Sequence, residues 1–337
     1  NVPPLRFPEF SGEWKCTTIG NIGDIKNGPF GSVLHAEDYV ENGIPIVTTE
    51  HFKTGLMPSD KFGIPQVSNE DYIRLKGYRL ETNDIVFSRV GSVDINAHVG
   101  IEQNGWLFSG RVLRVRPKYD IDSLFLHYAL STEAVKRDIR NRAVGQTMPS
   151  INTPILSSTT IQLPKDLFEQ KKVAHFLRLL DERIITQNKI IEKLQSLIKG
   201  LRVCCMQRVY GNNVYLSEIA QIYQPQTISS TELTEDGFLV YGANGIIGKY
   251  KDYNHETEQI CITCRGNTCG MVNYTKPMSW ITGNAMVINT DKYQDKVCKR
   301  YLYHYLSAYN FNSIISGSGQ PQIVRTPLEK LKITLPT

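Results

Sequence analysis

Four cysteines and one histidine in the second half of the chain could, by residue type, hold a metal ion. Cys261, Cys264 and Cys269 are followed by Cys298, and His255 precedes them. The two-residue gap between Cys261 and Cys264 is typical of a zinc knuckle. However, both lie in a strand-like run, where residues three apart point to opposite faces of a sheet. We therefore predict no metal site and interpret these thiols as small buried side chains of a reduced protein.

Two glycine-rich segments could bring the backbone close to a phosphate group. They are GPFGS at 28–32 and YGANGIIGKY at 241–250. Neither has the lysine of a P-loop or the glycine spacing of a dinucleotide-binding loop. We interpret both as turns that approach a partner, and nucleic-acid phosphate is one candidate.

No catalytic constellation stands out. The sequence has no N/D-P-P-F/Y motif of an amino-methyltransferase and no Walker motif, and the segment 84–89 lacks the lysine of a PD-(D/E)-x-K nuclease. We therefore predict no catalytic residues and favour a binding protein over an enzyme.

Length and composition predict two globular domains with a connector. The chain has 337 residues, of which 41% are hydrophobic and 21% charged. The net charge of +5 permits nucleic-acid binding without requiring it. Seven cysteines, an odd number that includes the adjacent pair Cys204 and Cys205, do not suggest a secreted disulfide framework. We expect a cytoplasmic protein that does not enter a membrane.

The longest regular pattern predicts a connector helix at 165–209. Asp166 stands at the N-cap position with Glu169 three residues later, and no proline interrupts the pattern. Such a helix is roughly 60 Å long. Its apolar residues recur at alternating steps of three and four, which favours pairing with another helix, although an amphipathic helix lying on one core remains an alternative. The seam consists of Leu177, Leu180, Ile184, Gln187, Ile191, Leu194, Ile198 and Leu201.

The segments on either side of this helix resemble each other. TPILSSTTIQLP ends at Pro164 and TPLEKLKITLP ends at Pro336. Upstream, FLHYALS at 125–131 matches YLYHYLS at 301–307, and IVFSRVG at 85–91 matches ICITCRG at 260–266. An ordered series of matches indicates two copies of one domain.

Each copy contains short β-branched and aromatic runs between Gly, Asn and Pro turns, followed by an amphipathic helix, at 121–142 or 296–315. The predicted class is α+β: two similar domains, 1–164 and 210–337, have twisted, mostly antiparallel sheets and are joined by a long coiled-coil-forming α-helix.

With these features the chain resembles, over essentially its whole length, the specificity subunits of type I restriction–modification enzymes. The most specific match is LP-x4-EQ-x2-(I/V)-A-x-F-L-x2-LDE-x-I, which ends at Ile184. Weaker matches are GNIGDIKNGPFGS, NDIVFSRVGS, YGANGIIGKY and ITCRGNTCGMV.

The resemblance implies two target-recognition domains that each read one half of a bipartite DNA site. It implies that the helix spaces the two readers and docks two methyltransferase subunits, which bind S-adenosylmethionine and methylate adenine N6. A restriction–translocation subunit that uses ATP and Mg²⁺ can join them, whereas this chain binds no cofactor. The family has a second long helix after the second domain, expected to begin at Thr337, and without it the seam is exposed or covered by another chain.

Reading a sequence requires Arg, Lys, Asn, Gln and Ser side chains at loop tips that enter a groove. We expect Arg89 and Arg265 to contribute most as a pair, because arginine beside a glycine-rich turn can bind guanine with two hydrogen bonds. The candidates of the first domain are Lys26, Asn27, Ser88, Arg89, Ser92, Arg111 and Gln146, and those of the second are Asn244, Lys249, Thr263, Arg265, Asn267, Asn284 and Gln320. Each could instead be ordinary solvated surface.

Three alternatives remain open. The chain could serve a related restriction–modification system with differently organised catalytic subunits, act as a protein-binding scaffold, or be a self-contained restriction enzyme. A scaffold would not share the steep salt dependence of DNA binding, which comes from counterion release.

Overall fold

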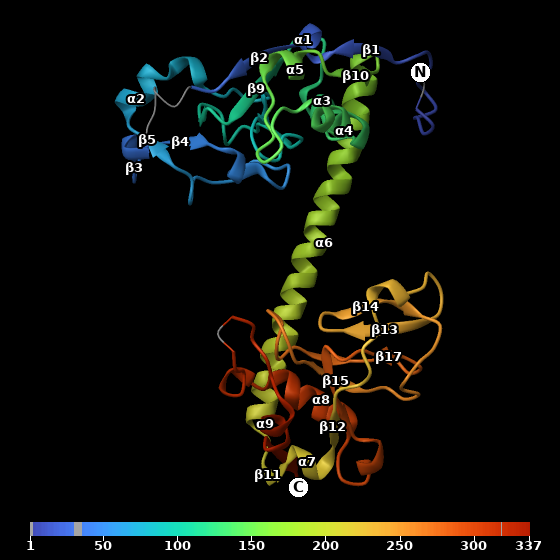
Figure 1. Cartoon of the computed structure of the whole chain (residues 1–337). Coiled ribbons are helices and arrows are strands. Elements are labelled where there is room, and N and C mark those ends of the chain that lie inside the picture. The colour runs from blue at the N-terminus through green and yellow to red at the C-terminus, as the bar shows by residue number, and fades with distance from the viewer. Residues whose placement is uncertain (1–2, 30–35, 318) are drawn as a thin grey trace. The chain divides into compact units, whose positions relative to one another are not determined.

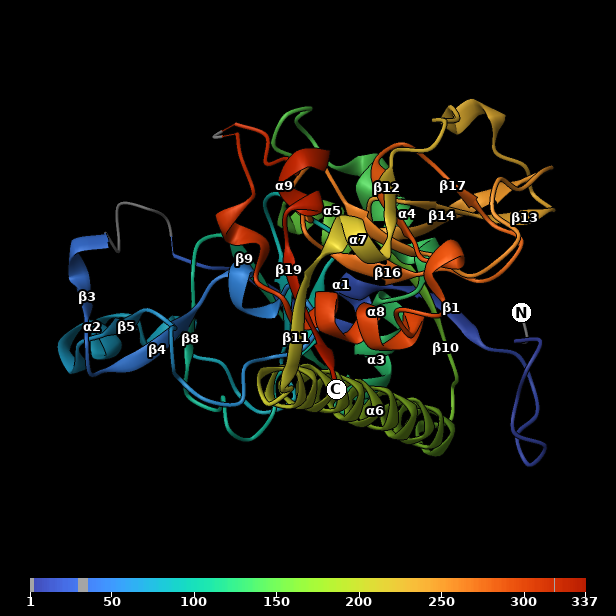
Figure 2. The same cartoon turned by 90° about the horizontal axis from the view of Figure 1, so that it is seen from below.

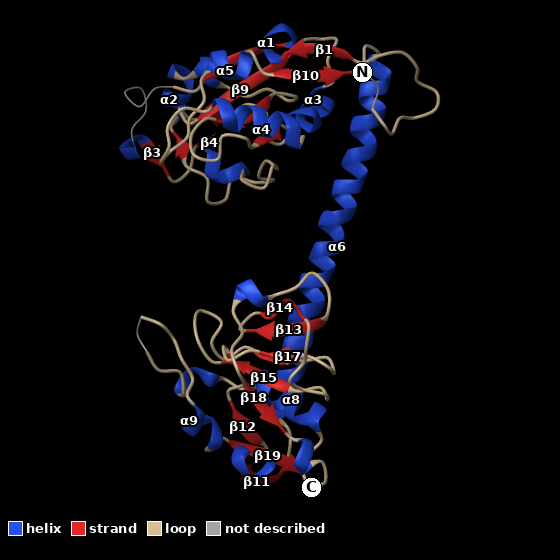
Figure 3. Cartoon of the chain, turned by 45° about the vertical axis from the view of Figure 1, so that its right-hand side comes forward, coloured by secondary structure: helices blue, strands red, loops and turns tan. Residues whose placement is uncertain are grey.

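The computed structural model describes residues 3–29, 36–317 and 319–337, and the chain divides into two compact units, Asn1–Thr186 and Gln187–Thr337. The boundary falls inside one helix, α6 (Leu167–Gln207), which Figure 3 shows as an uninterrupted ribbon. The predicted connector helix is therefore confirmed as an element.

The described residues of the first unit form three small sheets. The first pairs β1 with β10, and the central sheet has the antiparallel order β2-β9-β6-β7. The third has the order β3-β5-β4-β8, in which β4 and β8 run parallel. Figures 1 and 2 both show this third sheet at the end of the unit farthest from β1 and β10. The strands are β1 (Lys15–Thr18), β2 (Gly23–Asn27), β3 (Tyr39–Val40), β4 (Ile44–Val47), β5 (Gln66–Val67), β6 (Ile85–Ser88), β7 (Asn96–His98), β8 (Leu107–Phe108), β9 (Val112–Pro117) and β10 (Thr160–Leu163).

Helices of the first unit cover the central sheet. Phe87 and Leu113 of the sheet share a core cluster with Leu126 of the helix α3, and all three are fully buried. The helix predicted over 121–142 is broken into two helices, because Thr132 is extended (φ −67°, ψ 145°). The helical elements are α1 (Ile19–Ile22), η1 (Ala36–Asp38), η2 (Thr49–Phe52), α2 (Asn69–Arg74), η3 (Lys76–Tyr78), α3 (Ser123–Leu130), α4 (Glu133–Arg142) and α5 (Thr153–Ser157).

The second unit repeats this plan. β11 pairs with β19 as β1 does with β10, and the order β12-β18-β15-β16 reproduces the central sheet. A third sheet, β14-β13-β17, again contains one parallel pair, β13 with β17. The structure confirms the predicted α+β class, with two similar and mostly antiparallel domains. The elements are β11 (Gly211–Tyr215), α7 (Leu216–Ile219), β12 (Gln221–Tyr223), η4 (Ser230–Glu232), β13 (Phe238–Gly242), β14 (Gly245–Tyr250), β15 (Ile260–Thr263), β16 (Val272–Tyr274), β17 (Trp280–Ile281), β18 (Ala285–Asn289), η5 (Asp291–Tyr293), α8 (Lys299–Ala308), η6 (Phe311–Ser313), α9 (Arg325–Glu329) and β19 (Lys332–Pro336).

The start of α6 is fixed by its cap and by the N-terminal segment. The Asp166 carboxylate accepts a hydrogen bond from the Phe168 N–H at 2.8 Å, as expected of an N-cap residue. Glu169 does not complete a capping box. Its buried carboxylate instead accepts hydrogen bonds from the Arg6 guanidinium at 2.7 Å and from the Trp14 indole at 3.1 Å.

Most of the predicted seam of α6 lies open to solvent. Leu177 is half-buried in the first unit, and Gln187 is exposed. The apolar positions beyond Leu177 are 43–63% exposed; they are Leu180, Ile184, Ile191, Leu194, Ile198 and Leu201. Pairing of this seam with another helix stays a prediction. No described helix is long and apolar enough to cross a bilayer.

Candidate nucleic-acid interface

Polar residues gather at one edge of the central sheet in the first unit. Antiparallel pairing brings the end of β2 at Asn27 and the end of β6 at Ser88 beside the start of β9 at Val112. At this edge the Arg89 N–H donates to the Arg111 carbonyl at 3.0 Å. Residues from three strand ends therefore lie close together.

The loop after α4 is anchored to the same edge. Val144 and Ser150 exchange backbone hydrogen bonds of 2.9 and 2.8 Å, which close a loop that contains Gln146. The N–H of the next residue, Ile151, donates to the Arg89 carbonyl at 2.9 Å, so the loop is held beside β6. We call the side chains of Asn27, Arg89, Ser92, Arg111 and Gln146 the first polar edge.

Three members of the first polar edge, Ser92, Arg111 and Gln146, are exposed. Arg89 is half-buried and donates from Nη1 to the Gly110 carbonyl at 3.1 Å, which leaves its other guanidinium N–H groups for a partner. Asn27 is also half-buried, and its Oδ1 has no hydrogen-bond donor among the described residues.

The second unit reproduces this edge with the same backbone bonds. The Cys264 N–H donates to the Asn284 carbonyl at 3.2 Å, and the Ile323 N–H donates to the Cys264 carbonyl at 3.0 Å. Ser316 and Gln322 exchange hydrogen bonds of 2.9 and 2.8 Å and close the corresponding loop. We call the side chains of Gln224, Arg265, Asn267, Asn284 and Gln320 the second polar edge; all five are exposed.

The turn after each of these strands has the same backbone conformation. Gly91 and Gly266 have φ values of 84° and 87°, a region that favours glycine. Their N–H groups donate to the carbonyls of Pro149 and Pro321 at 2.8 and 2.9 Å. The two edges can therefore be compared residue by residue.

This comparison corrects the pairing of Arg89 with Arg265. Arg89 corresponds to the buried Cys264, and Arg265 corresponds to Val90, because Val90 and Arg265 form equivalent bridges to the closing loops. The two arginines are one residue apart in register, so they are not copies of one reading position. Arg111 corresponds instead to Asn284.

The two glutamines predicted in the closing loops are also not at equivalent positions. Counted from the closing hydrogen bonds, Gln320 corresponds to Met148, which is 66% exposed. The counterpart of Gln146 is position 318, which lies outside the described residues.

Two candidates are excluded by burial. Ser88 and Thr263 are 1% and 0% exposed, since the ends of β6 and β15 lie inside the sheet. The Thr263 hydroxyl donates to the Ala243 carbonyl, and the Ser88 hydroxyl has no partner among the described residues. Their prediction as DNA-contacting side chains is wrong in this conformation, because neither hydroxyl reaches the surface.

The two predicted lysines, Lys26 and Lys249, are not members of either polar edge. Lys26 points its ammonium at the Tyr78 ring, 5.1 Å from the centroid. Lys249 lies 3.5 Å from the Asp236 carboxylate near the far end of β14. Asn244 does border the second polar edge, since its amide oxygen accepts a hydrogen bond from the Thr268 hydroxyl in the loop after β15.

Sequence reasoning missed Gln224. Tyr223 lies opposite Val287 in β18, so the next residue takes the place that Asn27 occupies opposite Leu113 in β9. The Gln224 amide donates to the Gly283 carbonyl at 3.0 Å. The equivalence of Gln224 with Asn27 follows from the strand register alone, because the sequences of β2 and β12 differ.

The glycine-rich segments are close-packed turns. A Cβ on Gly28 would lie 1.9 Å from the Ser109 carbonyl oxygen, so only glycine fits there. Residues 30–32 of the GPFGS motif fall outside the described residues. In the second segment, Gly245 turns the chain between β13 and β14 with a φ of 90°.

Comparisons with known proteins are consistent with this duplicated architecture. The family model for the type I restriction modification DNA specificity domain matches residues 11–196 and 212–337, which is most of the chain. The chain belongs to this specificity-domain family. Each matched stretch contains one copy of the fold.

Curated relatives of this specificity-domain chain carry the same description. It is 32% identical over 254 residues to a putative type I restriction enzyme MjaX specificity subunit of Methanocaldococcus jannaschii, covering 71% of this chain and 56% of that protein. It is 30% identical over 134 residues to the type I restriction enzyme EcoprrI specificity subunit of Escherichia coli, covering 38% of this chain and 33% of that protein. These alignments span a third to just over half of each relative.

Solved structures support the fold of the specificity-domain chain. The S subunit of a type I restriction–modification system from M. genitalium matches with a TM-score of 0.64 at 17% identity, covering 99% of this chain and 87% of that one. A second chain, described for complex assembly and conformational transition of the type I R–M system, matches with a TM-score of 0.54 at 15% identity and the same coverage.

All seven cysteines of the specificity-domain chain are free thiols, and two of them, Cys261 and Cys264, are buried. Cys261 and Cys264 are buried in different hydrophobic clusters, in agreement with the opposite strand faces expected from their spacing. Burial raises the pKa of the Cys261 thiol to about 12. Among the described residues, no three or more His, Cys, Asp or Glu side chains are grouped to hold a metal ion.

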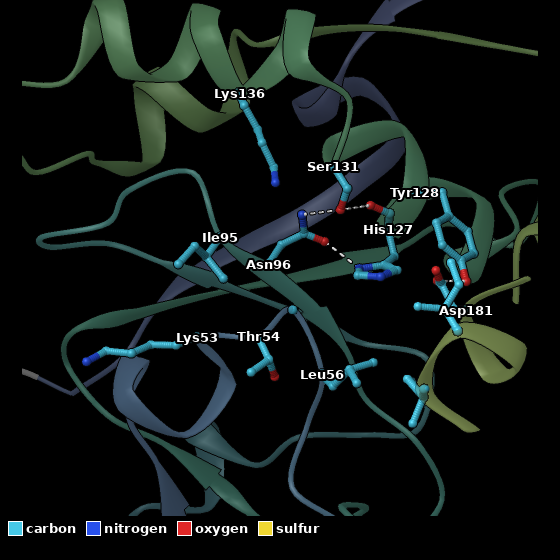
Figure 4. A pocket seen from close by; sticks show the side chains of 13 residues that line it. Lys53, Thr54, Leu56, Ile95, Asn96, His127, Tyr128, Ser131, Lys136 and Asp181 are labelled. Atoms are coloured by element: carbon cyan, nitrogen blue, oxygen red, sulfur yellow. Dashed lines mark hydrogen bonds between the residues drawn. The ribbon is translucent and has the colours of Figure 1, made fainter. Parts of the chain in front are cut away.

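The first specificity domain also contains a pocket of about 390 Å³ with both polar and apolar lining residues (Figure 4). At its wall, His127 Nδ1 lies 2.7 Å from the Asn96 amide oxygen, and the Asn96 amide donates to the Ser131 hydroxyl at 3.1 Å. Because the amide oxygen only accepts, Nδ1 carries the proton. Burial, together with the neighbouring His98, lowers the pKa of His127 to about 4.

This hydrogen-bond network is a structural element of the first domain. It ties α3 to β7, and nothing in the sequence suggested it, because its members lie on separate elements. By strand register and helix alignment, the second domain has Val272 and Tyr303 in place of Asn96 and His127.

Proposed function

We propose that this chain is the sequence-reading subunit of a type I restriction–modification system, and that each domain reads one half of a bipartite DNA site. The observation that carries the proposal is the pair of polar edges. Equivalent backbone bonds hold different side chains at equivalent positions, among them the exposed pairs Arg111 with Asn284 and Ser92 with Asn267. A duplicated scaffold with different side chains at its loop tips suits the reading of two different half-sites, because base contacts specify sequence whereas shared backbone contacts only position the protein.

The helix α6 acts as the spacer in this proposal. Its 41 residues correspond to a length of roughly 60 Å. The DNA between the half-sites is spanned without being read. The exposed apolar seam offers a surface for a second helix and for two methyltransferase subunits.

Catalysis belongs to the partners and not to this chain. The methyltransferase subunits bind S-adenosylmethionine, flip an adenine out of each half-site and methylate its N6. A restriction–translocation subunit with ATP and Mg²⁺ completes the nuclease, which defends the prokaryotic host against foreign DNA in the cytoplasm. A system with differently organised catalytic subunits would use the same reader.

The test is selection from a random-sequence duplex library. The full-length protein is co-expressed with the methyltransferase of the same system, and bound DNA is recovered at two salt concentrations. We expect enrichment of a bipartite site with an unread middle, and binding that weakens steeply with salt because phosphate contacts release counterions. Weak, salt-insensitive binding without enrichment would contradict the proposal and favour a protein-binding scaffold.

A further inference from the structure

The clearest chemical difference between the two polar edges lies at one equivalent position. Arg111 immediately precedes β9, and Asn284 immediately precedes β18. Each follows a glycine, and the carbonyl of each accepts the hydrogen bond described above from the residue after β6 or β15. The backbone therefore presents both side chains at the same place on the scaffold.

Both side chains are available to a ligand. Arg111 and Asn284 are exposed, and neither side chain makes a hydrogen bond or ion pair with another described residue. In contrast, Arg114 and Arg116 of the same strand are held by Asp24 and Asp84. Arg111 thus differs from the arginines that stabilise the fold.

The two side chains match different bases. The guanidinium has only donors, in a fork that fits O6 and N7 of guanine. The amide of asparagine has a donor and an acceptor, which fit N7 and N6 of adenine. A phosphate contact would be the same in every sequence and would favour a cation in both copies, whereas the second copy has a neutral amide.

We infer that Arg111 and Asn284 are the residues that make the two half-sites differ at equivalent base pairs, Arg111 by binding guanine and Asn284 by binding adenine. This inference rests on the proposed function. It goes further by naming one base and one side chain in each half.

The neighbours of each residue fit the same division. The first polar edge adds the Arg89 guanidinium, whose N–H groups are not all used. The second adds the exposed amides of Gln224 and Asn267. The first polar edge therefore has two guanidinium groups and two amides, whereas the second has one guanidinium group, that of Arg265, and four amides.

The experiment exchanges the two residues in the full-length protein, together with its methyltransferase, and repeats the library selection. We expect N284R to replace one A·T pair by G·C in the second half-site and to leave the first half-site unchanged. R111N should make the converse change in the first half-site. Each preference should shift by roughly 5- to 150-fold, the range for one bidentate base contact.

Matched controls make the same change of charge away from the polar edges. Gln221→Arg adds a charge in β12, opposite Asn289 at the other end of β18, and Lys118→Asn removes one just after β9. Both should leave both half-sites unchanged. If an exchange variant fails to fold, N284A and R111A serve instead, and each should lose one base preference without gaining another.

Three results would overturn the inference. One is a wild-type site whose half-sites contain no guanine and adenine at equivalent positions. The second is an exchange, or its alanine substitute, that leaves the base preference unchanged. The third is a loss of affinity that is uniform over all sequences and lowers the salt slope by about one, which indicates a phosphate contact. If the wild-type protein selects no bipartite site, the proposed function itself fails, so the two failures are distinguishable.

Discussion

Acidification should destabilise the first domain through His127. This side chain is 8% exposed, and burial lowers its pKa to about 4, whereas an unfolded histidine titrates near 6.5. Between these values the unfolded chain binds a proton that the folded domain does not. The contribution of neutral His127 to stability is therefore fully present above pH 6.5 and is lost as the pH falls toward 4.

The size of the effect follows from the two pKa values. Between pH 7 and pH 4.5 the difference in proton binding amounts to roughly 2 kcal/mol of unfolding free energy. His98 has a pKa lowered by burial and titrates in the same direction, so the contribution of His127 must be isolated by substitution. His127→Gln keeps an N–H donor for the Asn96 amide oxygen and removes the titrating ring.

Hydrogen exchange of the amides of α3 measures this free energy in the intact chain. We expect the wild type to lose about 2 kcal/mol more than H127Q between pH 7 and pH 4.5. The exposed His175 on α6 supplies the control, because H175Q should follow the wild type. Equal losses of unfolding free energy in wild type and H127Q would refute the reasoning, since they would mean that folding does not lower the pKa of His127.

Three further predictions concern α6. The first inserts seven residues that continue the heptads after Gln187. Because they add roughly 10 Å, the unread spacer should lengthen by about three base pairs. Changed half-sites in the library selection would contradict the spacer role. Leu194→Lys should leave the chain's own melting temperature nearly unchanged, since this side chain is 53% exposed. In titrations it should weaken assembly with the partner subunits by roughly 10- to 100-fold. Undiminished assembly would exclude the seam as a docking surface. Glu169→Ala should lower the free energy of unfolding and release the N-terminal segment, because it leaves the Arg6 guanidinium without its carboxylate partner. Limited proteolysis should then cut the N-terminal segment, whereas exposed Glu182→Ala should change neither property, and resistance of E169A to proteolysis would show that the ion pair does not hold the segment.

The duplicated scaffold holds different side chains on the same backbone. The backbone bonds at Arg89 and Cys264 are the same, although one side chain is a half-buried guanidinium and the other a buried thiol. One pattern of strand pairing can therefore present unrelated side chains without changing the sheet. This explains why the fold recurs in both halves while the exposed residues of the two edges diverge.

The sequence by itself determined the features that depend on local periodicity and local chemistry. The connector helix followed from its apolar repeat and from Asp166 at its start, and the structure has it at Leu167–Gln207. The duplication followed from matched segments. The opposite faces of Cys261 and Cys264 followed from the two-residue period of a strand.

Only the tertiary structure decided which polar residues lie together. The polar edges arise from hydrogen bonds between distant segments, such as Gly91 with Pro149, and from strand registers that a sequence pattern does not encode. Those registers buried Ser88 and Thr263 and brought Gln224 to the second polar edge. The physical reason is the alternation of side chains along a strand, because a displacement of one residue moves a side chain from solvent to the core.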